Sequence, residues 1–145
     1  MSDLIIQCPS CGTKNRIPST IMNLQPKCGR CGHKLNVNQT GTVIELDDAG
    51  FENIVISSSL PVMVDFFSPS CGPCQILAPV IETVAKKYAN RVLIAKLDTS
   101  RHQLTAGRYS IRGVPTLIFF KNGKVVDQLV GAAPQAQIEQ KLNSL

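Results

Sequence analysis

The stretch Pro61-Val62-Met63-Val64-Asp65-Phe66-Phe67-Ser68-Pro69-Ser70-Cys71-Gly72-Pro73-Cys74 joins an apolar run to two cysteines that are separated by two residues. The run Leu60–Phe67 is almost entirely apolar, which predicts a strand buried on both faces. Apolar residues then recur at helical spacing from Cys71 to Tyr88, and Pro79 is expected to kink that helix. The two cysteines therefore lie where a buried strand ends and a helix begins.

This position favours thiol chemistry. The first backbone N–H groups of a helix lack partners within it, and the helix dipole is positive at that end, so a thiolate at Cys71 is stabilised. The thiolate is the species that attacks a disulfide. Cys74 lies one helical turn further on, close enough to bond to Cys71 and release a partner. The alternatives are a pair of inert core cysteines and a metal-binding pair. A metal-binding pair would need two further ligands, yet every other cysteine lies among residues 1–40.

Strands and helices alternate on both sides of this stretch. The predicted strands besides Leu60–Phe67 are Val43–Leu46, Val92–Leu97, Thr116–Phe120 and Val125–Val130. The predicted helices besides the one at Cys71 run from a cap at Asp47 or Asp48 towards Ile56, from Ser100 to Arg108, and onward from Pro134. Asn122-Gly123 is a strong hairpin signal. The order βαβαβαββα predicts an α/β domain with a mixed central sheet.

Residues 1–40 differ from the remainder of the chain in composition and in their motifs. Cys8-Pro9-Ser10-Cys11-Gly12 recurs in similar form as Cys28-Gly29-Arg30-Cys31-Gly32, and residues 36–41 read as a polar link. Residues 1–40, which we call the head, have too few large apolar side chains to build a core unaided. We therefore predict a small module at 1–40 and a larger domain at 41–145.

The spacing Cys8-x₂-Cys11-x₁₆-Cys28-x₂-Cys31 is typical of a structural zinc site with four cysteine ligands. Four sulfurs close the coordination sphere, so the sequence predicts one structural Zn²⁺ per chain rather than a catalytic metal. Iron and two disulfides are the alternatives for the same four residues. His33 is assigned to the surface.

Residues 42–145 resemble thioredoxin, and the whole chain resembles the thioredoxin 2 branch of that family, which carries an N-terminal zinc motif. The matching segments are Val64-Asp65-Phe66, Cys71-Gly72-Pro73-Cys74, Lys96, Gly113-Val114-Pro115-Thr116 and Val130-Gly131-Ala132. The resemblance implies a thioredoxin fold, a mixed central sheet flanked by helices, behind a zinc-ribbon-like module. One residue departs from the family: a Trp usually precedes the first cysteine, whereas this chain has Ser70 and no Trp.

The resemblance also implies roles for site residues. Cys71 would be the exposed nucleophile and Cys74 the buried resolving thiol. Asp65 would be the buried carboxylate that assists proton movement at Cys74, and burial should raise its pKa. Lys96 would lie beside Asp65, and Pro115 would be a cis-proline that faces the redox pair and leaves neighbouring backbone open to an extended substrate.

These features predict a cytoplasmic protein disulfide reductase that acts by dithiol–disulfide exchange. Its expected partners are oxidised cytoplasmic proteins as substrates and thioredoxin reductase with NADPH as the electron source, and it is expected to be a monomer. Six cysteines without an export signal favour reduced thiols, and no apolar run is long enough to span a membrane.

A redox-sensing or partner-binding zinc module, with the thioredoxin domain as a regulated accessory, is the alternative function. Five basic residues against Asp3 give residues 1–40 a net charge of +4, whereas ten basic and nine acidic residues give the remainder +1. Such a head could contact nucleic acid. It contains no Phe, Tyr or Trp on which bases could stack, and a nucleic-acid partner is therefore not expected.

Overall fold

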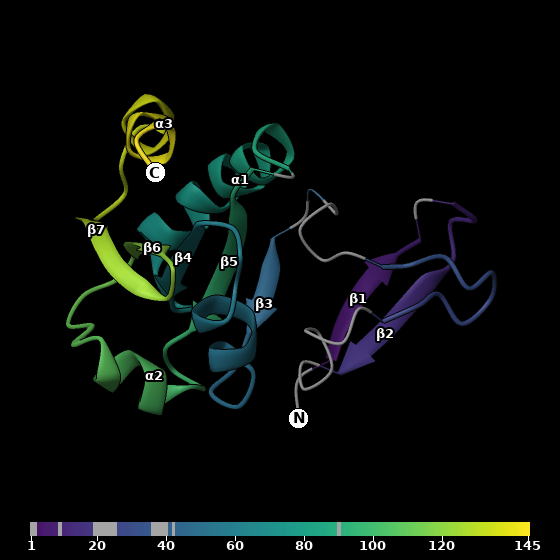
Figure 1. The fold of residues 1–145 in the computed structure, drawn as a ribbon. Helices are drawn as coiled ribbons and strands as arrows, with labels where there is room; N and C mark the ends of the chain where they lie inside the picture. Colours follow the sequence, from purple (N-terminus) through teal and green to yellow (C-terminus); the bar gives the residue numbers. More distant parts are fainter. Residues whose placement is uncertain (1–2, 9, 19–25, 36–40, 42, 90) are drawn as a thin grey trace.

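The computed structural model describes residues 3–8, 10–18, 26–35, 41, 43–89 and 91–145. The described strands form a two-stranded sheet near the N-terminus and a five-stranded sheet in the larger domain (Figure 1). Apart from Gly41, the predicted polar link lies outside the described residues.

The N-terminal sheet is an antiparallel pair of β1 (Asp3–Gln7) and β2 (Lys14–Pro18). Ile6 and Ile17 are buried, whereas Ile5 is half exposed, as alternation along a strand requires. This pair is not predicted from the sequence, because five-residue strands carry too short an alternation to stand out.

The central sheet has the order β3-β5-β4-β6-β7. Its parallel part consists of β3 (Ile44–Leu46), β5 (Leu93–Asp98) and β4 (Val62–Phe67). β6 (Thr116–Lys121) runs antiparallel to β4, and β7 (Lys124–Val130) antiparallel to β6. This arrangement confirms the predicted mixed sheet, with β4 flanked on both sides as its apolar sequence requires.

Helices cover both faces of this sheet (Figure 1). They are η3 (Glu52–Ile56), α1 (Gly72–Lys87), α2 (Gln103–Arg108) and α3 (Gln135–Asn143). Met63 packs with buried residues of α1 and α3 in one core, whereas Val64 and Phe66 belong to the core on the other face, with residues of η3. Because side chains alternate along a strand, Asp65 lies on the α1 side with Met63.

Of the two predicted capping residues, Asp47 makes the hydrogen bonds of a cap and Asp48 does not, although η3 itself begins only at Glu52. Asp47 Oδ1 accepts the N–H of Gly50 at 2.6 Å and so closes a turn ahead of η3. Asp48 Oδ1 accepts the backbone N–H and the hydroxyl of Thr105 at 2.8 and 2.6 Å, which ties α2 to this turn. A contact across 57 residues cannot be read from local sequence.

α2 also begins later than Ser100, where the sequence analysis started it. Asp98 Oδ1 accepts both the N–H and the hydroxyl of Ser100, at 2.9 and 2.6 Å, and this local turn competes with helix. Pro79 lies within α1 without ending it.

Candidate redox centre and four-cysteine cluster

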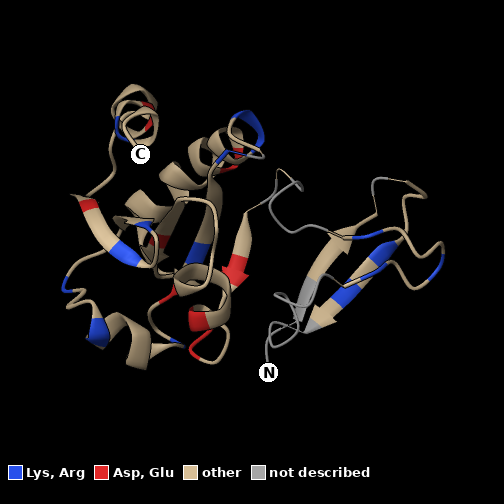
Figure 2. Cartoon of the chain, viewed as in Figure 1, with Lys and Arg blue, Asp and Glu red and all other residues tan. Residues whose placement is uncertain are grey.

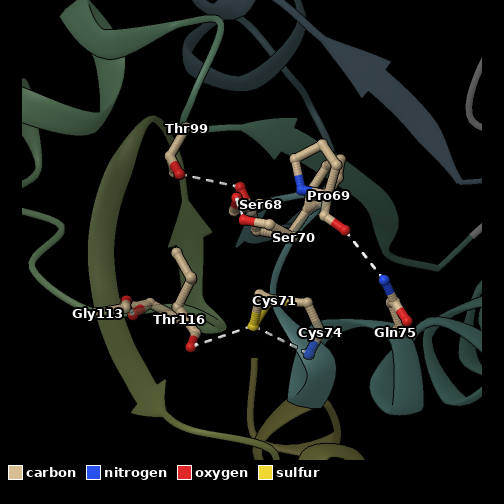
Figure 3. Close-up of a disulfide and its surroundings, with 11 residues drawn as sticks. Ser68, Pro69, Ser70, Cys71, Cys74, Gln75, Thr99, Gly113 and Thr116 are labelled. Carbon is tan, nitrogen blue, oxygen red and sulfur yellow. Dashed lines mark hydrogen bonds between the residues drawn. A yellow bond between two sulfur atoms is a disulfide. The ribbon is translucent and has the colours of Figure 1, made fainter.

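The redox pair lies at the N-terminal end of α1, directly after β4. Cys71 has extended backbone, is the last residue before the helix, and is joined to Cys74 by a disulfide (Figure 3). Cys71 is partly exposed, whereas the side chain of Cys74 is 4% exposed. The sulfur that an incoming molecule can reach is therefore that of Cys71.

Two backbone groups approach the sulfur of Cys71. The N–H of Cys74 donates to Cys71 Sγ at 3.2 Å, so the unpaired donors at the helix start do face the sulfur as the sequence predicts. The carbonyl oxygen of Val114 lies 3.5 Å from the same atom. The Val114–Pro115 peptide bond is cis, as the resemblance implies. The structure thus brings the Pro115 segment against the redox pair.

Asp65 is buried beside the pair. Its side chain is 4% exposed, and its Oδ1 has no hydrogen-bond partner among the residues that the structure describes. Burial raises the pKa of Asp65 to about 7, and the positive charge of Lys96, its neighbour across the β4–β5 pair, opposes that rise. A carboxyl group with this pKa exchanges protons near neutral pH.

A cavity of about 70 Å³ connects Asp65 with the buried sulfur. Its lining residues are Val43, Asp65, Phe67, Cys74, Ala78, Ile81, Glu82 and Lys96. This volume has room for several water molecules, each of which needs polar partners such as these carboxyl and ammonium groups. The ammonium of Lys96 lies 5.6 Å from the centroid of the Phe67 ring. Glu82 is not predicted as a site residue, because nothing in the helical pattern of α1 marks it as facing this cavity.

The four cysteines of the head converge. Their sulfurs all lie within 4.8 Å of one another, with Cys8 to Cys31 and Cys11 to Cys28 both at 3.6 Å. A tetrahedral zinc ion with Zn–S bonds of about 2.3 Å would hold its sulfurs about 3.8 Å apart. Hydrogen bonds from the backbone N–H groups of Cys31 and Arg30 lower the pKa of Cys28 to about 6. Despite a backbone hydrogen bond from His33, burial and the three neighbouring sulfurs raise the pKa of Cys31 to about 11. The donor set therefore fits a structural metal.

The two halves of the cluster repeat the same local structure. The N–H of Cys8 donates to Thr13 and that of Gly12 to Cys8, at 2.8 and 2.9 Å; Cys28, His33 and Gly32 repeat this pattern at the same distances. Gly12 and Gly32 have φ values of +78° and +77°, a conformation that glycine adopts without strain. The sequence repeat is thus a structural repeat.

Asn15 joins these two halves and was missed by the sequence analysis. Its side-chain amide donates to the carbonyl of Thr13 at 3.0 Å, and its Oδ1 accepts the N–H of Gly29 at 2.9 Å. The side chain is 9% exposed. No sequence signal marks Asn15 for this role, because its burial and its strand are seen only in the structure.

Comparison with known proteins supports both parts of the site. A sequence model of the family described as Thioredoxin matches residues 42–144. The chain belongs to the thioredoxin family. A second family model, described as Thioredoxin 2, N-terminal, matches residues 7–33. As a thioredoxin, the protein is a thiol–disulfide oxidoreductase, and the matched N-terminal segment contains all four cysteines of the metal-binding cluster.

Curated thioredoxins align with most of this chain. Thioredoxin of Haemophilus influenzae is 40% identical over 101 residues, covering 70% of this chain and 94% of that protein. Thioredoxin 2 of Chlorobaculum tepidum is 43% identical over 104 residues, covering 72% and 95%. Chloroplastic thioredoxin M-type of Pisum sativum is 43% identical over 97 residues; the aligned part spans 67% of this chain and 56% of the pea protein.

The rim of this thioredoxin's redox centre is polar where a Trp is usual. Ser70 is exposed, and its hydroxyl oxygen lies 3.2 Å from that of Ser68 (Figure 3). Gln75 donates to the carbonyl of Pro69 at 3.0 Å, which holds the loop against α1. Hydroxyl groups therefore border Cys71 on this side. Among the described residues, no helix is long and apolar enough to cross a membrane.

Proposed function

We propose that this thioredoxin reduces protein disulfides in the cytoplasm, with Cys71 as the nucleophile and Cys74 as the resolving thiol. The observation that carries this assignment is the difference in burial, since Cys71 is accessible and Cys74 is not. In the dithiol form, the Cys71 thiolate attacks one sulfur of a substrate disulfide. A mixed disulfide with Cys71 forms, the substrate S–S bond breaks, and one substrate thiolate leaves.

Cys74 completes the reaction in a second step. Its thiol gives up a proton, and the resulting thiolate attacks the sulfur of Cys71 in the mixed disulfide. The second substrate thiolate leaves, and the Cys71–Cys74 disulfide seen here is formed, with both substrate sulfurs reduced. Asp65 is the proposed proton acceptor, because its raised pKa suits it to neutral pH and the cavity joins it to Cys74.

Pro115 and Lys96 have supporting roles in this proposal. The segment at Pro115 presents the Val114 backbone beside Cys71, where an extended substrate segment can pair with it. Lys96 holds positive charge at the cavity and so limits how far the pKa of Asp65 rises.

The head would bind one structural Zn²⁺ through Cys8, Cys11, Cys28 and Cys31. Thioredoxin reductase, drawing on NADPH, would return the oxidised pair to the dithiol and so make the protein an electron carrier. We propose that the protein works as a monomer.

Serine substitution at each cysteine tests the two roles. Cys74→Ser should accumulate mixed disulfides with substrates, because only the release step is lost, whereas Cys71→Ser should form none and have no turnover. Mass spectrometry of the trapped complexes, together with insulin reduction, measures both. Trapping by Cys71→Ser but not by Cys74→Ser would reverse the assignment.

A further inference from the structure

The head carries a concentration of positively charged residues in its sequence. Residues 4–44 contain no Asp or Glu, whereas five Lys and Arg residues lie among them. In Figure 2 the described part of the head has blue segments and no red, and both colours mix in the larger domain. Residues 1–40, which include Asp3, have a net charge of +4. Four thiolates around one divalent metal ion carry about −2, so the head keeps a net charge of about +2 with the metal bound.

Four of these cations form what we call the cationic head surface: Lys14, Lys27, Arg30 and Lys34. All four are exposed. Lys27 and Lys34 lie directly opposite each other in an antiparallel bridge, an arrangement of like charges that costs stability. The hydrogen bond from Gly29 to Asn15, at 2.9 Å, holds the start of β2, next to Lys14, against the loop that carries Arg30.

Two cations of the larger domain, Lys87 and Lys141, form ion pairs with acidic side chains. The ammonium of Lys87 lies 2.6 Å from Glu139, and that of Lys141 lies 2.8 Å from Asp127. The head, by contrast, exposes the four cations named above, and residues 1–40 contain a single acidic residue, Asp3. A surface of this kind attracts a partner that brings the negative charge.

We propose that the cationic head surface docks acidic segments of the oxidised polypeptides that the redox centre reduces. This inference rests on the proposed function. A docked segment and its disulfide belong to one chain, so docking raises the effective concentration of that disulfide at Cys71. A polypeptide is favoured over nucleic acid because it alone can supply a disulfide to the attached redox centre, and because residues 1–40 contain no aromatic residue for base stacking.

The test uses the full-length, zinc-loaded chain and two peptides that contain the same disulfide, one with a tail of Asp and Glu and one with a neutral tail of equal length. Lys27→Gln/Lys34→Gln should raise KM for the acidic peptide about fivefold at low salt, with kcat unchanged. Salt at about 0.5 M should abolish the difference, because it screens exposed charges. The neutral peptide should react equally with both proteins.

Lys121→Gln/Lys124→Gln is the matched control. These lysines also lie opposite each other, in the β6–β7 hairpin, and their removal changes the net charge equally. Fluorescence anisotropy with a disulfide-free acidic peptide measures docking without any redox step, so failure of the proposed reduction would appear separately, as lack of turnover with both peptides.

Three results would overturn the proposal: equal effects of the two double variants, loss of zinc from the Lys27→Gln/Lys34→Gln protein, or tighter binding of an oligonucleotide than of the acidic peptide. Loss of zinc would mean that these cations serve to balance the thiolates.

Discussion

Two buried aspartates in adjacent strands, Asp65 and Asp98, differ in their hydrogen-bond partners. Both side chains are 4% exposed. Asp98 Oδ1 accepts two hydrogen bonds from Ser100, whereas Asp65 Oδ1 has no partner among the described residues and its pKa is raised to about 7. Burial without hydrogen bonds disfavours the charged carboxylate. The ionised carboxylate of Asp65 therefore lowers the stability of the folded protein.

We expect Asp65→Asn to stabilise the protein at neutral and higher pH. The folded-state pKa of Asp65 lies above its ordinary value of 3.8, so the folded state binds the proton more tightly between pH 3.8 and about 7, and stability falls as the pH rises through this window. The substitution should remove that loss, with a gain of up to about 4 kcal/mol at pH 8 and little gain near pH 4. Urea unfolding at both pH values measures it.

The same substitution should slow resolution by Cys74 more than the first attack by Cys71. Asp98→Asn is the control, since it disturbs a satisfied carboxylate and should not stabilise the protein at either pH. If Asp65→Asn lowers stability at pH 8 and leaves the resolution rate unchanged, Asp65 is a structural residue only.

The turn of the β6–β7 hairpin packs closely against the end of η3. Its turn residues Asn122 and Gly123 have φ values of +54° and +78°, as an Asn-Gly hairpin turn requires. A Cβ atom on Gly123 would also lie 2.8 Å from the carbonyl oxygen of Ile56 at the end of η3. Glycine at this position therefore satisfies both the turn and a close contact between elements.

Gly123→Ala should destabilise the protein by about 2 kcal/mol, because it combines a strained φ with a backbone clash. Thermal unfolding at neutral pH measures the loss. Gly107→Ala is the control: Gly107 lies within α2, has no atom within 4 Å of the added methyl group, and should hold or raise stability through better helix propensity. Equal melting temperatures for the Gly123→Ala protein and the parent would show that the turn can rearrange.

At the scale of the whole molecule, the two parts differ in what holds them together. The larger domain has apolar cores on both faces of its sheet, whereas the described residues of the head include five buried apolar residues: Ile6, Cys8, Ile17, Cys28 and Leu35. Structural zinc supplies on the order of 10 kcal/mol of apparent binding energy to such modules. The head should therefore depend on metal, and the larger domain should not.

A strong chelator should release about one zinc ion per chain and unfold the head, while the larger domain stays folded and active. Metal analysis measures the zinc released, and NMR shows which of the two parts stays folded. A chain shortened to residues 41–145 should still reduce insulin, with some loss of stability, because head residues belong to the same buried cluster as the η3 side of the sheet. Metal-free protein as purified, or a shortened chain that does not fold, would contradict this expectation.

Local patterns in the sequence determined much of this protein. The strand-to-helix junction at Cys71, the Asn-Gly hairpin and the repeated cysteine pairs each depend on contacts between residues near in sequence, so spacing and residue type were enough to predict them. The mixed sheet and the family are confirmed. The boundary between residues 40 and 41 and the roles of individual site residues stay predictions.

Only the tertiary structure decided what depends on distant segments. The cavity that joins Asp65 to Cys74, the approach of the Val114 carbonyl to Cys71 and the link from Asn15 to Gly29 all bring together residues from different elements. The same holds for Asp48, which binds Thr105 in α2 instead of capping its own helix. A polar side chain takes whichever partner the packed fold places within reach, and that choice is made by packing rather than by the residues beside it in sequence.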